Sequence, residues 1–202
     1  MNPTQQFWNE RYASEDFVYG TEPNVWFREQ LEALPVGRIL LPAEGEGRNA
    51  VYAARLGWEV FALDLSEKGK EKALKLAANA GVQMQYDLAD IRQYPVAENG
   101  PWDAVGLFYA HFPPELRAET HLRIAQALRA GGYLILEAFQ PEQLNRNSGG
   151  PKSADMLYTL DMLRNDFAGL REIHAFLASV ELDEGPGHSG VAEVVRLLLQ
   201  KP

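Results

Sequence analysis

The sequence contains no cysteine, which excludes disulfide bonds, thiolate metal ligands and a cysteine nucleophile. It is also short of basic residues, because 19 Lys and Arg stand against 28 Asp and Glu and leave a net charge of −9. No basic field is therefore available to gather phosphates. This argues against a general binder of nucleic acid or of anionic membranes.

Long apolar runs are missing as well. No stretch approaches the roughly 18 apolar residues of a membrane span, and MNPTQQFWNERY at the N-terminus lacks the apolar run of a signal peptide. Together with the absence of cysteine, this predicts a cytoplasmic protein. The sequence has no internal repeat, and its 202 residues with 46% hydrophobic content suit one domain with a sizeable core.

The most informative stretch is RILLPAEGEGRNAVYAARLGWEVFALDLS. Gly45 and Gly47 permit a tight turn and a close approach of backbone N–H groups to a ligand. Asp64 ends the second strand, where its carboxylate is placed to accept hydrogen bonds from two ribose hydroxyls. The pattern predicts half of a nucleotide-binding βαβ unit, with a strand over 38–42, a turn over 43–48, a helix over 49–56 and a strand over 59–63.

Two carboxylates, Glu44 and Glu46, stand beside these glycines. A dinucleotide would set its pyrophosphate at this helix N-terminus, where the carboxylates would repel it. S-adenosylmethionine has a ribose and an adenine but no phosphate, and its sulfonium and amino group are positive. The loop therefore favours S-adenosylmethionine over NAD, although the G-x-G-x-x-A string from Gly45 to Ala50 is by itself weak support for either.

The rest of the sequence alternates between strand and helix patterns. Alternation favours the α/β class, with a single doubly wound, mostly parallel seven-stranded sheet in which a C-terminal hairpin supplies an antiparallel strand. Ligands bind at the carboxyl ends of such strands, which selects the loops 43–49, 64–66, 87–90, 109–113, 140–156 and 183–190. The further predicted strands cover 82–86, 104–108, 133–139, 173–181 and 191–200, and the further helices cover 4–12, 25–34, 66–80, 114–129 and 160–167.

Within the single domain we expect three parts. Residues 1–36 form a helical cover, residues 37–139 form the cofactor-binding core, and residues 140–202 hold a lid loop, a helix and the terminal hairpin. A polar loop as long as 140–156 is usually a lid or a binding element. Its string Gly149-Gly150-Pro151-Lys152 is expected over the substrate, with a plain exposed loop as the alternative.

This arrangement resembles the class I S-adenosylmethionine-dependent methyltransferases over essentially the whole chain. The strings FWNERY, YGTEPN, GEGRNAVYAARLGWEV and ALDLS are similar to the small bacterial group that includes the tellurite-resistance and thiopurine-type methyltransferases. The resemblance implies a Rossmann-like methyltransferase fold, S-adenosylmethionine as cofactor and methyl transfer as the reaction. One departure stands out. Leu41 and Ala43 take the acidic and first glycine positions of the family loop, and Ala43 fits only if its φ is negative.

The resemblance also implies roles for individual residues. It places Asp87 and Leu88 at the adenine edge, with Asp90 as the second choice for the carboxylate and a turn cap as the alternative role of either. Trp8, Tyr12 and Tyr19 are expected to cover the cofactor, or else to pack an N-terminal helix on the sheet. The cofactor-binding candidates are Trp8, Arg11, Tyr19, Glu44, Gly45, Glu46, Gly47, Arg48, Asn49, Asp64, Leu65, Asp87, Leu88, Phe108 and Tyr109.

Three residues are candidates for the chemistry. Tyr109 and His111 follow the fourth strand, where the family contacts the target atom, and His188 lies in the glycine-flanked turn DEGPGHSG. Histidine is the side chain best suited to act as a base near neutral pH. The alternatives are a core aromatic for Tyr109 and surface or capping histidines. Two histidines without a closely spaced motif do not predict a metal site.

These inferences favour a methyltransferase that acts on a small molecule, as a monomer or homodimer with no nucleic-acid or membrane partner. A soft acceptor such as a thiol or chalcogen oxyanion needs chiefly positioning and desolvation, whereas an oxygen or nitrogen acceptor calls for a base. Three alternatives stay open: an NAD-dependent oxidoreductase, a non-catalytic S-adenosylmethionine- or S-adenosylhomocysteine-binding regulatory module, and a nucleic-acid methyltransferase. The last lacks an Asn-Pro-Pro-Tyr-like string after the fourth strand.

Overall fold

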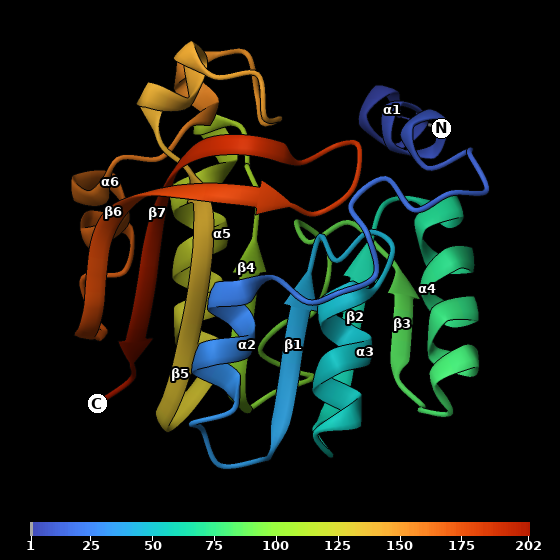
Figure 1. The fold of residues 1–202 in the computed structure, drawn as a ribbon. Helices are drawn as coiled ribbons and strands as arrows, with labels where there is room; N and C mark the ends of the chain where they lie inside the picture. The colour runs from blue at the N-terminus through green and yellow to red at the C-terminus, as the bar shows by residue number, and fades with distance from the viewer. Residues whose placement is uncertain (1) are drawn as a thin grey trace.

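One seven-stranded sheet organises the computed structural model, which describes residues 2–202. The strands lie in the order β3-β2-β1-β4-β5-β7-β6 (Figure 1). Strands β1 to β5 pair in parallel, and β7 pairs antiparallel with both β5 and β6. The predicted α/β fold is thereby confirmed. The strands are β1 Arg38–Pro42, β2 Glu59–Asp64, β3 Gln85–Leu88, β4 Trp102–Phe108, β5 Leu128–Phe139, β6 Arg171–Asp183 and β7 Ser189–Gln200.

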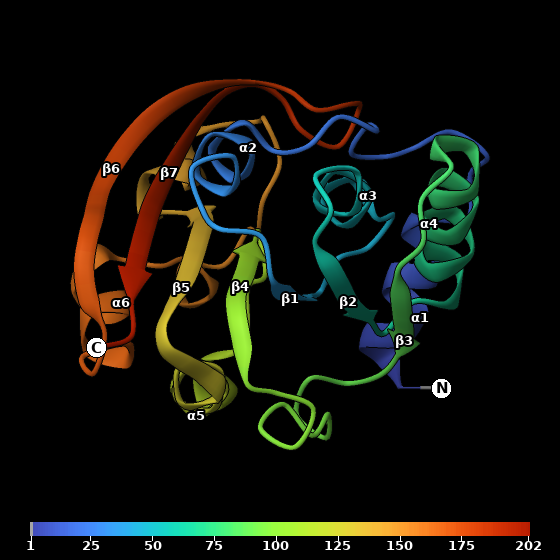
Figure 2. The same ribbon diagram turned by 90° about the horizontal axis from the view of Figure 1, so that it is seen from below.

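Helices cover both faces of this sheet. Residues of α2, α3 and α4 join an apolar cluster on one face, and residues of α5 and α6 join another on the opposite face. Figure 2 shows the sheet edge-on between these layers. No helix within residues 2–202 is both long and apolar enough to cross a bilayer. The helices are α1 Pro3–Arg11, α2 Val25–Leu31, α3 Arg48–Arg55, α4 Glu67–Ala80, α5 Pro114–Ala127 and α6 Leu160–Asp166.

The strand order fixes where a ligand can enter. β1 pairs with β2 on one side and with β4 on the other, so the chain leaves these two central strands in opposite directions. Such a switch point leaves a crevice at the carboxyl ends of the strands. Helix α1 lies over this edge of the sheet, beside α4 (Figure 1).

Most element boundaries differ from the sequence prediction by one to five residues, and two of the differences have a clear physical reason. β3 begins later, at Gln85, because Gly81 (φ 69°) ends α4 and the N–H of Val82 still donates to the last helical turn. α5 ends at Ala127, two residues earlier than predicted, and Gly131 and Gly132, which follow the predicted helix and would suit a helix end, lie inside β5. There Gly131 (φ 75°) coincides with a register shift in the pairing with β4.

The long polar segment 140–156 is partly ordered by two 3₁₀ helices, η1 (Pro141–Asn145) and η2 (Ala154–Met156). Gln143, only 1% exposed, fixes its first half. The side-chain carbonyl of Gln143 accepts from the Glu193 N–H of β7 (2.8 Å), and its amide donates to the Ser148 hydroxyl (3.0 Å). Closure of this segment over a substrate stays a prediction.

Helix α5 provides a test of the packing. Ile124→Ala is expected to lower the free energy of unfolding by about 2–5 kcal/mol, because the side chain is fully buried against the sheet. Leu122→Ala in the same helix is the matched control. Its side chain is 50% exposed, so the change should stay within about 0.5 kcal/mol. Urea unfolding of both variants measures the difference, and equal losses would contradict the assignment of the buried face.

Candidate functional site

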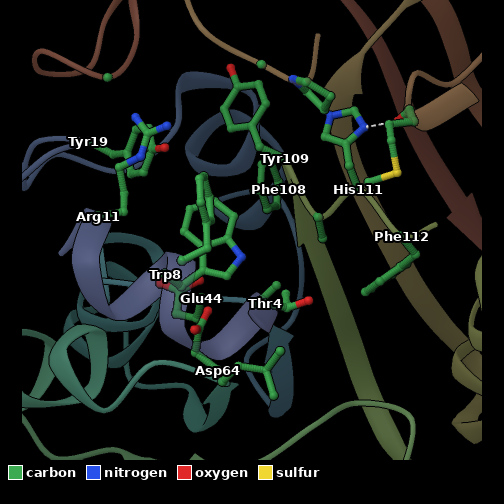
Figure 3. Close-up of a pocket in the computed structure, with 18 of the residues that line it drawn as sticks. Thr4, Trp8, Arg11, Tyr19, Glu44, Asp64, Phe108, Tyr109, His111 and Phe112 are labelled. Atoms are coloured by element: carbon green, nitrogen blue, oxygen red, sulfur yellow. Dashed lines mark hydrogen bonds between the residues drawn. The ribbon is translucent and has the colours of Figure 1, made fainter. Parts of the chain in front are cut away.

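A cavity of about 880 Å³ opens at the carboxyl ends of the strands, between α1 and the β6–β7 turn (Figure 3). A volume of this size is typical of small-molecule and cofactor sites. All six loops selected from the sequence contribute to its wall, which confirms the expected end of the sheet. The turn between β6 and β7 reaches this end because β6 runs in the same direction as the parallel strands.

The turn after β1 is shaped by its two glycines. Gly45 (φ 60°) and Gly47 (φ 88°) take left-handed conformations, and a Cβ on them would stand 2.5 Å from the Tyr12 hydroxyl and 2.6 Å from the Ala73 Cβ. The Gly45 N–H donates to the Asp64 carboxylate (3.0 Å). The glycines therefore permit close packing against α1 and α4, and the Gly45 amide is not free to meet a ligand. Neither glycine is part of the cavity wall.

Ala43 does not meet the condition of a negative φ under which an alanine fits this glycine position. Ala43 has φ 54° and Tyr109 has φ 53°, and both follow a central strand and line the cavity. A residue with a Cβ reaches this region only at a cost in strain, so surrounding contacts must hold it there. Hydrogen bonds fix both the backbone and the side chain of Tyr109. Its N–H donates to the Glu137 carbonyl (2.8 Å), and its hydroxyl donates to the Glu137 carboxylate (2.6 Å).

The two loop carboxylates have different roles. Glu46 is only 4% exposed. It accepts from the backbone N–H groups of Val18 and Tyr19 and pairs with Lys72 (2.6 Å), so it fixes the N-terminal segment to the loop. Glu44 faces the cavity with one oxygen accepting from the Ala50 N–H (2.7 Å), at the first turn of α3. Glu44 is therefore the loop carboxylate with capacity to meet a cation.

Burial raises the pKa values of two carboxyl groups in the cavity wall, those of Glu44 and Asp64. It raises the pKa of Glu44 to about 8, against the lowering effect of the Ala50 N–H. It likewise raises the pKa of Asp64 to about 6, although the N–H groups of Ser66 and Gly45 favour the charged form. A bound cation would favour the ionised carboxylates, so binding of positive charge here is coupled to loss of protons.

The adenine-edge residues lie elsewhere than the resemblance implied. Asp87 and Leu88 are not part of the cavity wall, and the Asp87 carboxylate accepts from the Tyr94 hydroxyl (3.2 Å). Asp90 is in the wall, and it is paired with Arg92. β3 ends only at Leu88, so the chain turns toward the cavity after that residue.

Aromatic side chains form much of the remaining wall. Trp8 of α1 stacks on Tyr12 (5.5 Å between ring centres), and Phe108 lies across the cavity from α1 (Figure 3). Arg11 and Tyr19 lie together at one side of the same space. The predicted residues Asn49 and Leu65 also line the cavity.

His111 does not have the geometry of a base. Its Nδ1 lies 2.7 Å from the Met156 carbonyl and its Nε2 accepts from the Phe139 N–H (3.2 Å). Both ring nitrogens are thus engaged with the backbone, and burial lowers the pKa of the imidazole to about 4. The neutral ring connects the 140–156 segment to the end of β5, which corrects its assignment as a catalytic candidate.

His188 has a different environment. Its Nδ1 lies 3.1 Å from the Glu184 carboxylate, and Glu184 is paired with Arg48 (2.9 Å). Hydrogen bonding to His188 and the nearby Arg48 charge overcome burial and lower the pKa of Glu184 to about 2. The His188 ring lies 4.4 Å from the rings of both Tyr19 and Tyr109.

Four polar residues beside the cavity were not predicted from the sequence: Asn24, Glu137, Glu184 and Arg196. Asn24 donates to Glu137 (2.7 Å) and to Glu184 (3.2 Å), and Arg196 pairs with Glu137. A signal was present, because Glu137 and Arg196 each interrupt an apolar strand and a buried charge requires a partner. We call Asn24, Arg48, Glu137, Glu184 and Arg196 the buried polar cluster. Within residues 2–202, no group of three or more His, Asp or Glu side chains is arranged to hold a metal ion.

The strand order, with a cavity at its switch point, gives the Rossmann-like fold that the sequence predicted. Residues 39–132 match a family model described as "Methyltransferase domain". Ribosomal RNA small subunit methyltransferase B of Thermus thermophilus is 32% identical over an alignment of 127 residues, and the alignment covers 52% of this chain and 31% of that protein. The match therefore spans less than a third of that relative's length.

Solved structures of low sequence identity share the fold. The N-methyltransferase NodS from Bradyrhizobium japonicum WM9, in complex with S-adenosyl-l-homocysteine, has a TM-score of 0.73 at 13% identity, over 100% of both chains. TehB from Haemophilus influenzae has a TM-score of 0.71 at 14% identity, over 98% of this chain and 67% of that one. These structures confirm the predicted Rossmann-like fold, and the family match agrees with the predicted methyltransferase domain over residues 39–132.

The raised pKa of Glu44 predicts a pH-dependent stability. Between its ordinary value of 4.5 and about 8, the folded protein keeps a proton that the unfolded chain has lost, so stability falls as pH rises through this window. Glu44→Gln keeps an acceptor for the Ala50 N–H without titrating. The variant should therefore gain stability relative to the unmodified protein from pH 5 to pH 8, as measured by urea unfolding.

Glu29→Gln, on the exposed side of α2, is the control and should leave the pH profile unchanged. Parallel stability curves for Glu44→Gln and the unmodified protein would show that Glu44 titrates normally.

Proposed function

We propose that this protein transfers the methyl group of S-adenosylmethionine to a small molecule. One observation carries the proposal: carboxylates, and a carbonyl of the loop itself, occupy three backbone N–H groups at the start of α3 and in the turn before it. The Ala50 N–H donates to the Glu44 carboxylate, the Gly45 N–H to Asp64 and the Gly47 N–H to the Glu44 carbonyl (3.3 Å). A pyrophosphate needs such donors, whereas a cofactor with a positive sulfonium and a ribose is favoured by the carboxylates that occupy them.

The cavity wall suggests how the cofactor would lie. Asp64 would accept from the ribose hydroxyls, and Glu44 would face the positive methionine amino group. Arg11, which lines the same cavity beside Tyr19, would pair with the cofactor carboxylate. Trp8 and Phe108 supply aromatic walls, which suit a sulfonium. The adenine edge would meet the segment that contains Asp90.

The small-molecule acceptor is favoured over RNA. The curated relative is named for ribosomal RNA, but the net charge of −9 gives this chain no basic field to gather a polynucleotide. The aromatic wall and the cover by α1 fit an acceptor small enough to enter the cavity. The finer assignment to the tellurite-resistance and thiopurine-type group is part of this proposal, as are a cytoplasmic location and a monomeric or homodimeric state.

Titration calorimetry with S-adenosylmethionine, S-adenosylhomocysteine and NAD tests the cofactor. Micromolar binding of the first two is expected, with no binding of NAD. Asp64→Asn should weaken binding at least about tenfold, or 1.4 kcal/mol, because an amide is a poorer partner for two ribose hydroxyls. Repeating the titration in buffers of different ionisation enthalpy should show proton release near pH 7, because the cofactor's positive charge favours ionised Glu44.

The matched pair Asp87→Asn and Asp90→Asn separates the two adenine assignments. A loss confined to Asp90→Asn supports the cavity geometry, and a loss confined to Asp87→Asn supports the family pattern. Binding of NAD alone would overturn the proposed function. Binding of the first two ligands without turnover on small molecules or ribosomal RNA would favour the regulatory module.

A further inference from the structure

The β6–β7 turn presents a carboxylate–imidazole pair to the cavity. The Glu184 carboxylate accepts from Nδ1 of His188 (3.1 Å), and Arg48 and Asn24 hold the carboxylate from its other sides (2.9 and 3.2 Å). A carboxylate that remains ionised fixes the proton on Nδ1 and leaves the lone pair on Nε2. Glu184 thus orients the His188 ring so that Nε2 can accept a proton.

His188 is part of the cavity wall, and only its Nδ1 is engaged by the carboxylate. Nε2 makes no hydrogen bond to any other group in residues 2–202, and it lies beside Gly149 in the wall, where a Cβ on Gly149 would stand 3.4 Å from it. His111 differs in having both nitrogens bound to the backbone. His188 is thus the one of these two cavity histidines with a nitrogen available for proton transfer.

Aromatic rings pack around the His188 imidazole, beside the Arg48–Glu184 ion pair. The rings of Tyr19 and Tyr109 lie 4.4 Å from the imidazole and that of Phe139 lies 5.3 Å away. Such walls fit a planar acceptor. Arg48 adds a positive charge, and its buried Nη1 has no hydrogen-bond partner in the described chain, so developing negative charge on an acceptor oxygen is favoured here.

On the basis of the proposed methyl transfer, we propose that the acceptor is a planar molecule bearing a phenol- or enol-type hydroxyl, and that Nε2 of His188 removes its proton. The acceptor oxygen attacks the methyl carbon. The carbon–sulfur bond breaks with its electron pair going to sulfur, which gives S-adenosylhomocysteine, and the hydroxyl proton goes to Nε2. The resulting imidazolium is stabilised by Glu184, a positioning residue.

The acidity of the acceptor hydroxyl favours a phenol or enol over an aliphatic alcohol or a thiol. A phenol, with a pKa near 10, is a much stronger acid than an alkyl alcohol, so a neutral imidazole removes its proton far more readily. A thiol near 8.5 supplies its own thiolate and has no need of the pair. Burial lowers the pKa of His188 and Glu184 opposes this, so the ring is neutral at pH 7. The charged and titratable groups that face it are Glu184, Arg48, Glu137, Tyr19 and Tyr109.

The experiment follows S-adenosylhomocysteine formation from pH 5 to 9 with panels of phenols, enols, aliphatic alcohols and thiols. The unmodified protein should use phenols or enols, with kcat/KM falling at low pH as one group protonates. His188→Asn keeps a donor for Glu184 and should lower kcat/KM about 100-fold or more, with S-adenosylmethionine affinity within about twofold. Glu184→Gln should lower kcat and move the pH midpoint, which a merely structural role would not do.

His174→Asn, on the exposed side of β6, is the control and should match the unmodified protein. Turnover of phenols by His188→Asn at more than half the normal rate, or turnover of thiols alone, would overturn the inference while leaving methyl transfer intact. Cofactor binding without turnover of any phenol or enol would also overturn it. Failure of the unmodified protein to bind S-adenosylmethionine would instead overturn the proposed function.

Discussion

The site depends on the burial of charge at the point where four parts of the chain meet. Glu137 is fully buried at the end of β5, and the Tyr109 hydroxyl, Asn24 and Arg196 donate to its carboxylate. Removing one partner from such a group leaves an uncompensated charge, which costs far more than the pair contributes. The N-terminal segment, β4, β5 and β7 are therefore constrained to meet in one arrangement.

This constraint has consequences on both sides of the cavity. On one side it stabilises the left-handed backbone at Tyr109 and places its ring beside His188. On the other, Asn24 joins Glu184 to the first turn of α3, because its own N–H donates to the Asn49 side chain (2.9 Å). The loop after β1 and the turn after β6 are thus parts of one hydrogen-bonded structure, although they are far apart in the sequence.

Much of the fold followed from local pattern. Apolar strands alternating with helices sufficed for the parallel sheet, and the glycine-bearing turn with Asp64 after the next strand sufficed for the active end. Local pattern failed where contacts with residues distant in the sequence decided the backbone conformation. Gly131 looked like a helix stop, yet pairing with β4 draws its segment into β5. Ala43 would fit its glycine position only at a negative φ, but the described turn holds it at 54°.

The sequence by itself determined the order of elements and the end of the sheet at which the cavity opens, because these depend on periodicity and on the direction of the strands. Tertiary structure alone decided which titratable groups are free. His111 and His188 are indistinguishable as residue types, but backbone groups occupy both nitrogens of one, whereas Glu184 occupies a single nitrogen of the other. Glu44 and Glu46 likewise diverge, because the N-terminal segment and Lys72 engage only Glu46. Proton affinity and availability depend on burial and on distant partners, which spacing along a chain does not encode.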